Sequence, residues 1–484
     1  MSTRPDQLPD PSADRPAART IGELRESGWR SRSVKSELRS NLLARLGEGR
    51  AIFPGVIGYA DSVLPAVENA ILAGQDLVFL GERGQGKTRM ARLLVGLLDP
   101  WLPVIAGGEL NDDPFAPISP SARALVAEGA DETPIAWLPR DRRYGEKLAT
   151  PDISIADLIG EVDPIRVAEG RYLSDELVIH YGLIPRSNRG IFAINELPDL
   201  AERIQVGLLN ILEERDVQVR GFTIRLPLDL FVVASANPED YTNRGRIITP
   251  LKDRFGAEIR THYPLSLEDE LELINQEAAV SWDGQDPGAD LPVHLIEVIA
   301  RFTRLVRESP AVDSRSGVSA RFAIAAAESA AAAAVRRTAL IAEARDETPV
   351  ARVADLPGIV PTLRGKVEFE VSEEGREEEI LNHLLRRAIA ETFRARLGGA
   401  DLSGLLAKFE EGGSIESGEL VSATELLRRT GEVPGLARIM ARLGMEGRES
   451  FGEAAAAIEF VLEGLYLIRR LSKDTADGTS TYRT

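Results

Sequence analysis

Apolar runs alternate with helical periodicity over the first half of the chain. A lead-in helix is expected over residues 21–46, with a break near Gly28. The runs predicted as strands are 76–81, 102–107, 190–196 and 229–237, and the segments predicted as helices are 87–98 and 200–214. Strands that alternate with helices are typical of a parallel sheet with helices on both faces. This half is therefore predicted to be an α/β domain.

Beyond Pro264 the strand-like runs disappear and helical periodicity dominates. Residues 321–337 are rich in alanine and are predicted to form a stable helix. The last dozen residues, 473–484, are polar and are expected to fray. The pattern divides the chain into a disordered tail (1–20), the α/β domain (21–263), a helical domain (264–370) and a C-terminal helical region (371–484).

Composition and charge narrow the classes of protein. The chain has 484 residues, 43% of them hydrophobic and 28% charged, which excludes a wholly disordered or fibrous protein. Its net charge of −18 disfavours a nucleic-acid partner, and no apolar run approaches the ~20 residues of a membrane span. The absence of cysteine excludes disulfides and thiolate nucleophiles and fits a cytoplasmic location. The four histidines lack metal-ligand spacing and are expected to be surface or packing residues.

The strongest motif is GERGQGKT at residues 81–88, which matches G-x-x-x-x-G-K-[ST] between a predicted strand and a predicted helix. The glycines let backbone N–H groups curl around phosphates, Lys87 faces the β and γ oxygens, and Thr88 can ligate Mg²⁺. The motif therefore predicts a site for ATP and Mg²⁺. The residues predicted to contact the nucleotide here are Gly81, Glu82, Arg83, Gly84, Gln85, Gly86, Lys87, Thr88 and Arg89.

A second strand ends in Asn195-Glu196, where a P-loop ATPase normally has Asp-Glu. Glu196 is in place to polarise an attacking water. Asn195 takes the position of the aspartate that normally steadies the magnesium shell, but it carries no negative charge. Weaker Mg²⁺ binding or slower turnover is therefore expected, and Asn195→Asp is expected to lower the Mg²⁺ requirement. The structural alternative is a buried strand that merely ends in a polar turn.

Three further polar residues carry little information by themselves. Asn237 ends the last predicted strand and would hold the attacking water or the γ-phosphate, but it precedes Pro238, and an Asn-Pro pair also begins ordinary turns. Arg254 and Arg321 are isolated arginines, which on protein surfaces are usually solvated or paired. Their meaning depends on the order in which they follow the P-loop.

Taken in that order, the motifs resemble those of AAA+ ATPases, and more closely of the magnesium chelatase I subunit and MoxR branch. The resemblance covers residues 50–370, and it implies a P-loop NTPase AAA+ core, with helices on both faces of a parallel sheet, followed by an α-helical lid and a C-terminal helical region. It rests on GERGQGKT, on residues 150–197, on ILEERDVQVRGFTIRLP, on VVASANPED and on PLKDRFG.

The resemblance also assigns roles to residues. Glu196 is the catalytic carboxylate, Asn237 is sensor 1, Arg254 reaches a neighbouring subunit's ATP, and Arg321 is the sensor 2 arginine of the lid. Arg244 and Arg246 are alternatives to Arg254. The segment Val56-Ile57-Gly58 is expected to line the adenine. In such proteins the stretch up to RSNRG (186–190) carries an insertion in the second helix, and VQVRGFTIRL makes a hairpin before the sensor strand. Both loops typically touch partners.

The leading hypothesis is an ATPase that assembles into a ring of six and remodels or loads a protein partner. No Asp-x-Ser-x-Ser motif occurs, so a von Willebrand A domain would be a separate partner. One alternative is a chelatase motor subunit that drives Mg²⁺ or Co²⁺ into a tetrapyrrole. Another is a nucleotide-gated scaffold with little hydrolysis because of Asn195. A DNA-directed motor is disfavoured by the acidic charge.

Overall fold

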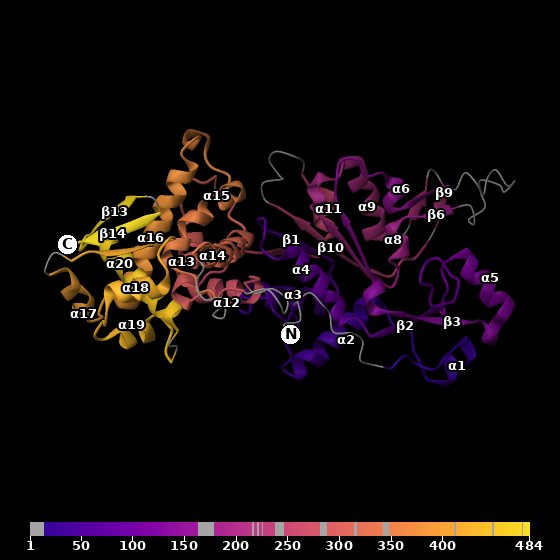
Figure 1. Ribbon diagram of the computed structural model, residues 1–484. Helices are drawn as coiled ribbons and strands as arrows, with labels where there is room; N and C mark the ends of the chain where they lie inside the picture. Colours follow the sequence, from indigo (N-terminus) through magenta and orange to yellow (C-terminus); the bar gives the residue numbers. More distant parts are fainter. Residues whose placement is uncertain are drawn as a thin grey trace. The chain divides into compact units, whose positions relative to one another are not determined.

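The computed structural model describes two compact units, Met1–His262 (unit 1) and Tyr263–Thr484 (unit 2) (Figure 1). The residues that the structure describes are 14–162, 179–214, 217–219, 222–224, 226–237, 246–280, 288–313, 317–341, 348–410, 413–447, 450–476 and 478–484.

The centre of unit 1 is a five-stranded sheet in the order β11-β1-β10-β7-β4, and all of its neighbouring strands run parallel. Its strands are β1 (Leu77–Leu80), β4 (Tyr144–Leu148), β7 (Gly190–Asn195), β10 (Leu230–Ala236) and β11 (Ala257–Arg260). Because parallel strands end at the same edge, the tips of β1, β7 and β10 lie together. The two outer strands, β4 and β11, were not predicted from the sequence.

Alternate residues of the sheet face two separate cores. Phe192 and Ile194 of β7 pack with α9 and α11, whereas Ile191 and Ala193 pack on the opposite face with α2, α3 and α4. This period of two is the one expected for strands buried on both faces.

The helices described in unit 1 are α1 (Ile21–Glu26), α2 (Val34–Gly47), α3 (Val63–Leu72), α4 (Lys87–Leu93), α5 (Pro120–Gly129), α6 (Ile155–Leu158), α8 (Leu183–Arg186), α9 (Glu202–Glu214) and α11 (Thr249–Arg254).

The lead-in segment forms two helices, α1 and α2, so the break expected near Gly28 is confirmed. Gly28 lies between them with a φ of 76°, the left-handed region that glycine adopts without strain. The helix expected over 87–98 ends as an α-helix at Leu93 and continues as a 3₁₀ helix, Leu94–Leu97.

The prediction for residues 102–107 was wrong in one respect. They lie in β2 (Trp101–Ile105), which is not in the parallel sheet but pairs antiparallel with β3 (Ile135–Pro139) in a two-stranded sheet. Pro103 has no N–H to donate, so it fits a strand paired on one side better than a central strand. Part of the expected disordered tail is also ordered here: Trp137 Nε1 donates to Ala18 O at 2.8 Å, and Ile135 N donates to Arg19 O.

Unit 1 contains two further two-stranded antiparallel sheets. One pairs β5 (Gly160–Val162) with β6 (Ile179–Tyr181), and residues 163–178 of the expected insertion lie outside the described residues. The other pairs β8 (Val217–Val219) with β9 (Phe222–Ile224), the position where the resemblance implies a hairpin.

A buried ion pair ties the lead-in helix α2 to the central sheet. Glu37 and Arg143 are each almost fully buried, and the two carboxylate oxygens accept from Nη1 and Nη2 of Arg143 at 2.7 Å. The same guanidinium donates to Arg189 O, just before β7. A bidentate pair of this kind fixes geometry, and removing one partner would leave an uncompensated buried charge.

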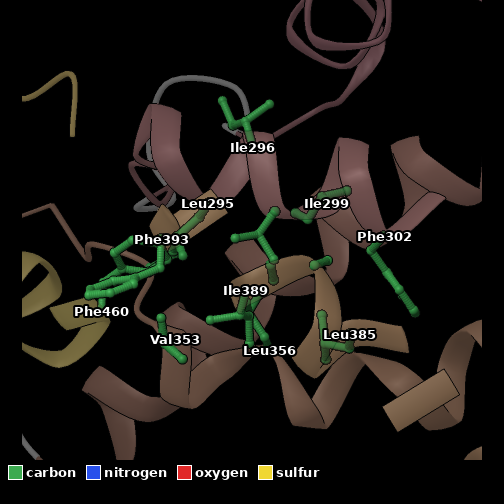
Figure 2. Close-up of a cluster of buried hydrophobic side chains, with 14 of the residues drawn as sticks. Leu295, Ile296, Ile299, Phe302, Val353, Leu356, Leu385, Ile389, Phe393 and Phe460 are labelled. Carbon is green, nitrogen blue, oxygen red and sulfur yellow. The ribbon is translucent and has the colours of Figure 1, made fainter. Parts of the chain in front are cut away.

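Unit 2 is built around one hydrophobic core. Its helices are α12 (Leu267–Glu277), α13 (Val293–Arg307), α14 (Ala320–Leu340), α15 (Val360–Leu363), α16 (Glu377–Leu397), α17 (Ser403–Leu406), α18 (Ala423–Thr430), α19 (Leu436–Arg442) and α20 (Phe451–Leu467). Figure 2 shows Ile299 of α13, Ile389 of α16 and Phe460 of α20 in the same cluster. The boundary expected near residue 370 therefore does not separate two compact parts, because α16 packs on α13 across it.

The expectation that residues 473–484 fray was also wrong. They form β13 (Ser472–Ala476) and β14 (Thr479–Arg483), and β14 pairs on its other side with β12 (Ile415–Gly418). Tyr482 is buried, and its hydroxyl donates to Glu463 Oε2 of α20 at 2.6 Å. The sequence carried a signal for this hairpin, an Asp-Gly pair at 477–478.

His294 of α13 makes the stability of the protein depend on pH. It is fully buried beside Phe460, and burial, with a further contribution from the charge of Arg396, lowers its pKa to about 3. An unfolded histidine titrates near ~6.5, so the unfolded chain takes up a proton first as the pH falls, and stability is lost between those two values.

We therefore expect the free energy of unfolding to fall by roughly 2 kcal/mol from this residue between pH 7 and pH 5. Denaturant titrations of the wild type and of His294→Gln at both pH values measure the difference. His383→Gln, which removes an exposed histidine, is the matched control. An equal pH dependence in wild type and His294→Gln would contradict the assignment.

Candidate functional site

The candidate site lies where β1 ends and α4 begins. Gly81 follows β1, and Gly86 is the N-cap of α4 with a φ of 74°, while Gly84 has a φ of 73°. Left-handed backbone at these two glycines turns the loop back toward the start of the helix. The N-terminus of α4 therefore points into the loop, as a phosphate site requires.

Gly81 is required for a different reason, the close approach of its neighbours. A Cβ at this position would lie 1.9 Å from Thr261 Oγ1 and 2.3 Å from Gln85 Oε1. These two side chains are hydrogen bonded to each other at 2.7 Å, and Thr261 directly follows β11. The loop is thus held against the adjacent strand by a contact that only glycine allows.

Lys87 joins the loop to the tip of β10. Its Nζ donates to Asn237 Oδ1 at 2.7 Å and to Glu82 O at 2.7 Å, and it also donates to Gly81 O. Lys87 and Asn237 are both buried, at 8% and 3% exposure. Two residues 150 positions apart in sequence are therefore in direct contact.

Thr88 lies next to the tip of β7. Its Oγ1 is 3.4 Å from Asn195 Oδ1, which also accepts from Ser235 Oγ at 3.2 Å. The neighbouring Glu196 is half-buried and has a φ of 56°, and its backbone N–H donates to Ser235 Oγ. A non-glycine residue in the left-handed region is uncommon, and here it turns the chain sharply at the end of the strand.

Sequence reasoning missed Glu146, which lies on β4 beside β7. Its Oε1 accepts from Asn195 Nδ2 at 2.6 Å, and its carboxylate is paired with Arg92 of α4 at 2.8 and 3.0 Å. Burial works to raise the pKa of Glu146, but the hydrogen bonds and charge of Arg92, together with the Asn195 amide, hold it below its ordinary value. The signal was weak because β4 has few large apolar residues.

The oxygen atoms at the tip of β7 fit a magnesium ion. Among the residues that the structure describes, no group of three His, Cys, Asp or Glu side chains could hold a metal. Mg²⁺, however, commonly keeps several waters and binds through few protein ligands together with substrate phosphates. Thr88 Oγ1 and Asn195 Oδ1 are such oxygen donors, and Glu146 provides a carboxylate one hydrogen bond away.

The segment predicted to line the adenine, Val56-Ile57-Gly58, is half-buried just before Tyr59. Tyr59 Oη lies 2.8 Å from Gln85 O and 2.7 Å from His262 O, and its single O–H can donate to either carbonyl, so this segment is linked to the P-loop. Burial raises the pKa of Tyr59 to about 12, so its hydroxyl stays a donor at neutral pH.

Four arginines complete the predicted set. Arg254 is exposed at the end of α11, and Arg246 is exposed shortly before that helix, whereas Arg244 lies outside the described residues. Arg321 is exposed in the first turn of α14 in unit 2, where its backbone N–H donates to Ser319 Oγ. The structure thus brings together Lys87, Thr88, Asn195 and Asn237, with Glu196 adjoining Asn195.

A parallel sheet in this order, with a P-loop after β1 and polar tips on β7 and β10, defines an AAA+ P-loop core, followed by a largely helical unit. The chain is related to the I subunit of magnesium chelatase. It is 28% identical over 229 residues to the magnesium-chelatase subunit ChlI of Euglena gracilis, covering 44% of this chain and 60% of that relative. The chain thus spans about three fifths of the relative's length.

Other comparisons give weaker likenesses. The chain is 27% identical over 97 residues to the acetoin dehydrogenase operon transcriptional activator AcoR of Bacillus subtilis (strain 168), which is 20% of this chain and 16% of that protein. No family model matches the sequence.

Two solved structures show loose overall resemblance. A putative ATPase from Cytophaga hutchinsonii has 17% identity and a TM-score of 0.28, covering 75% of this chain and 98% of that one. A complex of magnesium chelatase subunits BchI and BchD has 21% identity and a TM-score of 0.35, covering 68% and 98%. Within the described parts of the chain, no helix is long and apolar enough to cross a membrane.

Proposed function

We propose that the chain binds ATP with Mg²⁺ at the P-loop and hydrolyses it. The observation that carries this proposal is the contact of Lys87 with Asn237, together with the contact of Thr88 with Asn195, at one edge of the sheet. These groups come from three separate segments of the chain. Their types and positions match what phosphoryl transfer needs, a cation and a metal ligand beside the phosphates.

Each residue has a defined part in the proposed reaction. The loop N–H groups and Lys87 bind the phosphates, and Lys87 exchanges its contacts with Gly81 O and Asn237 for phosphate oxygens. Thr88 and Asn195 would hold Mg²⁺, which would supply positive charge beside the phosphates. Glu196 takes the proton of the attacking water, and Asn237 orients that water or the γ-phosphate.

We further propose that the protein assembles into a ring, with six subunits as the expected number, and remodels or loads a protein partner. In this arrangement Arg254 acts on the ATP of a neighbouring subunit, and Arg321 acts as the sensor in the helical unit. The client is a separate protein, for which a von Willebrand A-domain protein is the candidate, and the site of action is the cytoplasm. The acidic charge argues against a nucleic-acid client.

A second candidate function is supported by the similarity to a magnesium-chelatase subunit, which favours a motor that drives Mg²⁺ or Co²⁺ into a tetrapyrrole. Metal insertion in a mixture reconstituted with a porphyrin-binding subunit distinguishes the two. The scaffold hypothesis, in which ATP binds but turns over very slowly, is distinguished by the turnover of the purified protein.

Lys87→Ala is expected to abolish ATP binding, because the loop keeps its N–H groups but loses the charge that faces the β and γ oxygens. Calorimetry with ATP and Mg²⁺ measures the affinity, and thermal melting verifies the fold. Lys366→Ala, which changes an exposed lysine of unit 2, is the matched control. Unchanged affinity in the Lys87→Ala protein would remove this loop from the proposal.

Glu196→Gln is expected to keep ATP binding and to lower kcat by at least ~100-fold, in line with the usual contribution of a general base. Steady-state phosphate release measures kcat. Glu202→Gln, an exposed glutamate in the first turn of α9, should leave turnover near that of the wild type. If Glu196→Gln turns over normally, the base is another residue.

Arg254→Ala is expected to lower turnover while leaving ATP affinity near normal, because its guanidinium acts on a neighbour's site. Arg246→Ala tests the alternative arginine in parallel. Mixing Arg254→Ala with Glu196→Gln protein under subunit exchange should restore part of the activity, since some interfaces then carry both intact groups. No recovery on mixing would argue against action between subunits.

A further inference from the structure

The side-chain amide of Asn195 is held in one orientation by its neighbours. Its Nδ2 is 2.6 Å from Glu146 Oε1, and its Oδ1 accepts from Ser235 Oγ and faces Thr88 Oγ1. An ionised carboxylate can only accept hydrogen bonds, so the amide atom that faces Glu146 must be the nitrogen. The amide oxygen is consequently turned toward Thr88.

Glu146 is itself fixed by Arg92, which belongs to the same helix as Lys87 and Thr88. Arg92 Nε and Nη2 contact the two oxygens of the carboxylate at 2.8 and 3.0 Å, a bidentate pair. The side chain of Glu146 is 22% exposed and that of Arg92 is 62% exposed, so water screens the pair mainly on the arginine side. A continuous chain of contacts therefore runs from α4 through β4 to the tip of β7 and back to Thr88.

An aspartate at position 195 would not fit this arrangement. It would place a carboxylate oxygen where Nδ2 now lies, within 2.6 Å of Glu146 Oε1. Two carboxylates at such a distance repel each other. The asparagine is therefore matched to Glu146, and this geometry argues against the expectation that Asn195→Asp alone lowers the Mg²⁺ requirement.

We propose that Glu146 is a positioning residue for the magnesium site: it aims Asn195 Oδ1 at the metal and supplies, one hydrogen bond away, the negative charge that an aspartate would carry at position 195. This inference rests on the proposed binding of ATP with Mg²⁺. In this arrangement the carboxylate lies on the adjacent strand β4 and not at the tip of β7. Leu148 of β4 is the partner of Asn195, and Glu146 lies two residues earlier.

The test compares the wild type with Glu146→Gln, Asn195→Asp and the double variant that carries both changes. The first readout is the dependence of ATP binding on Mg²⁺. Calorimetry gives the association constant for ATP at several Mg²⁺ concentrations, and the readout is the Mg²⁺ concentration at which this constant reaches half of its saturating value. Glu146→Gln should raise it by about tenfold, which is within the coupling expected for contacting residues. The double variant moves the charge back to position 195 and should return the Mg²⁺ requirement to within about threefold of the wild type.

The second readout is the melting temperature without nucleotide and without Mg²⁺. Asn195→Asp should melt below the wild type because the two carboxylates repel, and adding Glu146→Gln should remove that loss. Glu128→Gln, an exposed glutamate of α5, should change neither readout. A purely structural role for Glu146 would lower the melting temperature of Glu146→Gln without changing its Mg²⁺ dependence.

The inference fails if Glu146→Gln leaves the Mg²⁺ dependence of ATP binding unchanged, or if the double variant needs as much Mg²⁺ as Glu146→Gln alone. The proposed function fails in a different way, with no ATP binding by the wild type at any Mg²⁺ concentration. In that case the melting temperatures still decide whether Glu146 and Asn195 are matched, because they are measured without nucleotide.

Discussion

The site depends on the parallel direction of the central strands. Because β1, β7 and β10 all end at the same edge, the P-loop, Asn195 and Asn237 meet there although they are far apart in sequence. Glycine is needed where the loop approaches Thr261, and a left-handed residue at Glu196 turns the chain away from β7. An antiparallel neighbour in place of β7 or β10 would carry its polar tip to the opposite edge.

Polar groups at this edge are already paired with one another. Lys87 is bonded to Asn237 and Glu82, and Asn195 is bonded to Glu146 and Ser235. Buried polar groups without partners are costly, so such pairing holds the side chains in place before a ligand arrives. In the proposed function, Lys87 exchanges its hydrogen bonds with Asn237 and Glu82 for contacts with phosphate oxygens. The free energy lost when it leaves its present partners is thereby offset.

The sequence predicted those parts of the fold whose residues carry a local motif or a continuous apolar run. The P-loop was predicted from its glycine and lysine motif, and β7 and β10 were predicted because their apolar runs are buried on both faces. Glu146 was missed because β4 is an outer strand whose residues are half-exposed, so hydrophobic pattern says little about it. The C-terminal hairpin was missed because its polar residues conceal Tyr482, whose burial depends on a contact with Glu463 made only in the folded unit.

The neutral residue at position 195 is weak evidence for a protein that has lost hydrolysis. Compared with the aspartate that a P-loop ATPase normally has here, Asn195 lacks one negative charge at the tip of β7. The scaffold hypothesis was based on this difference. Glu146, however, brings a carboxylate within 2.6 Å of that amide, and Arg92 holds it there. Arg92, whose side chain is 62% exposed, weakens the field of Glu146 at the amide but does not cancel it, because the carboxylate lies nearer to the amide than the guanidinium does. The charge near the proposed metal position therefore includes Glu146 as well as residue 195. Asn195 by itself does not favour the scaffold hypothesis over an ATP-hydrolysing motor.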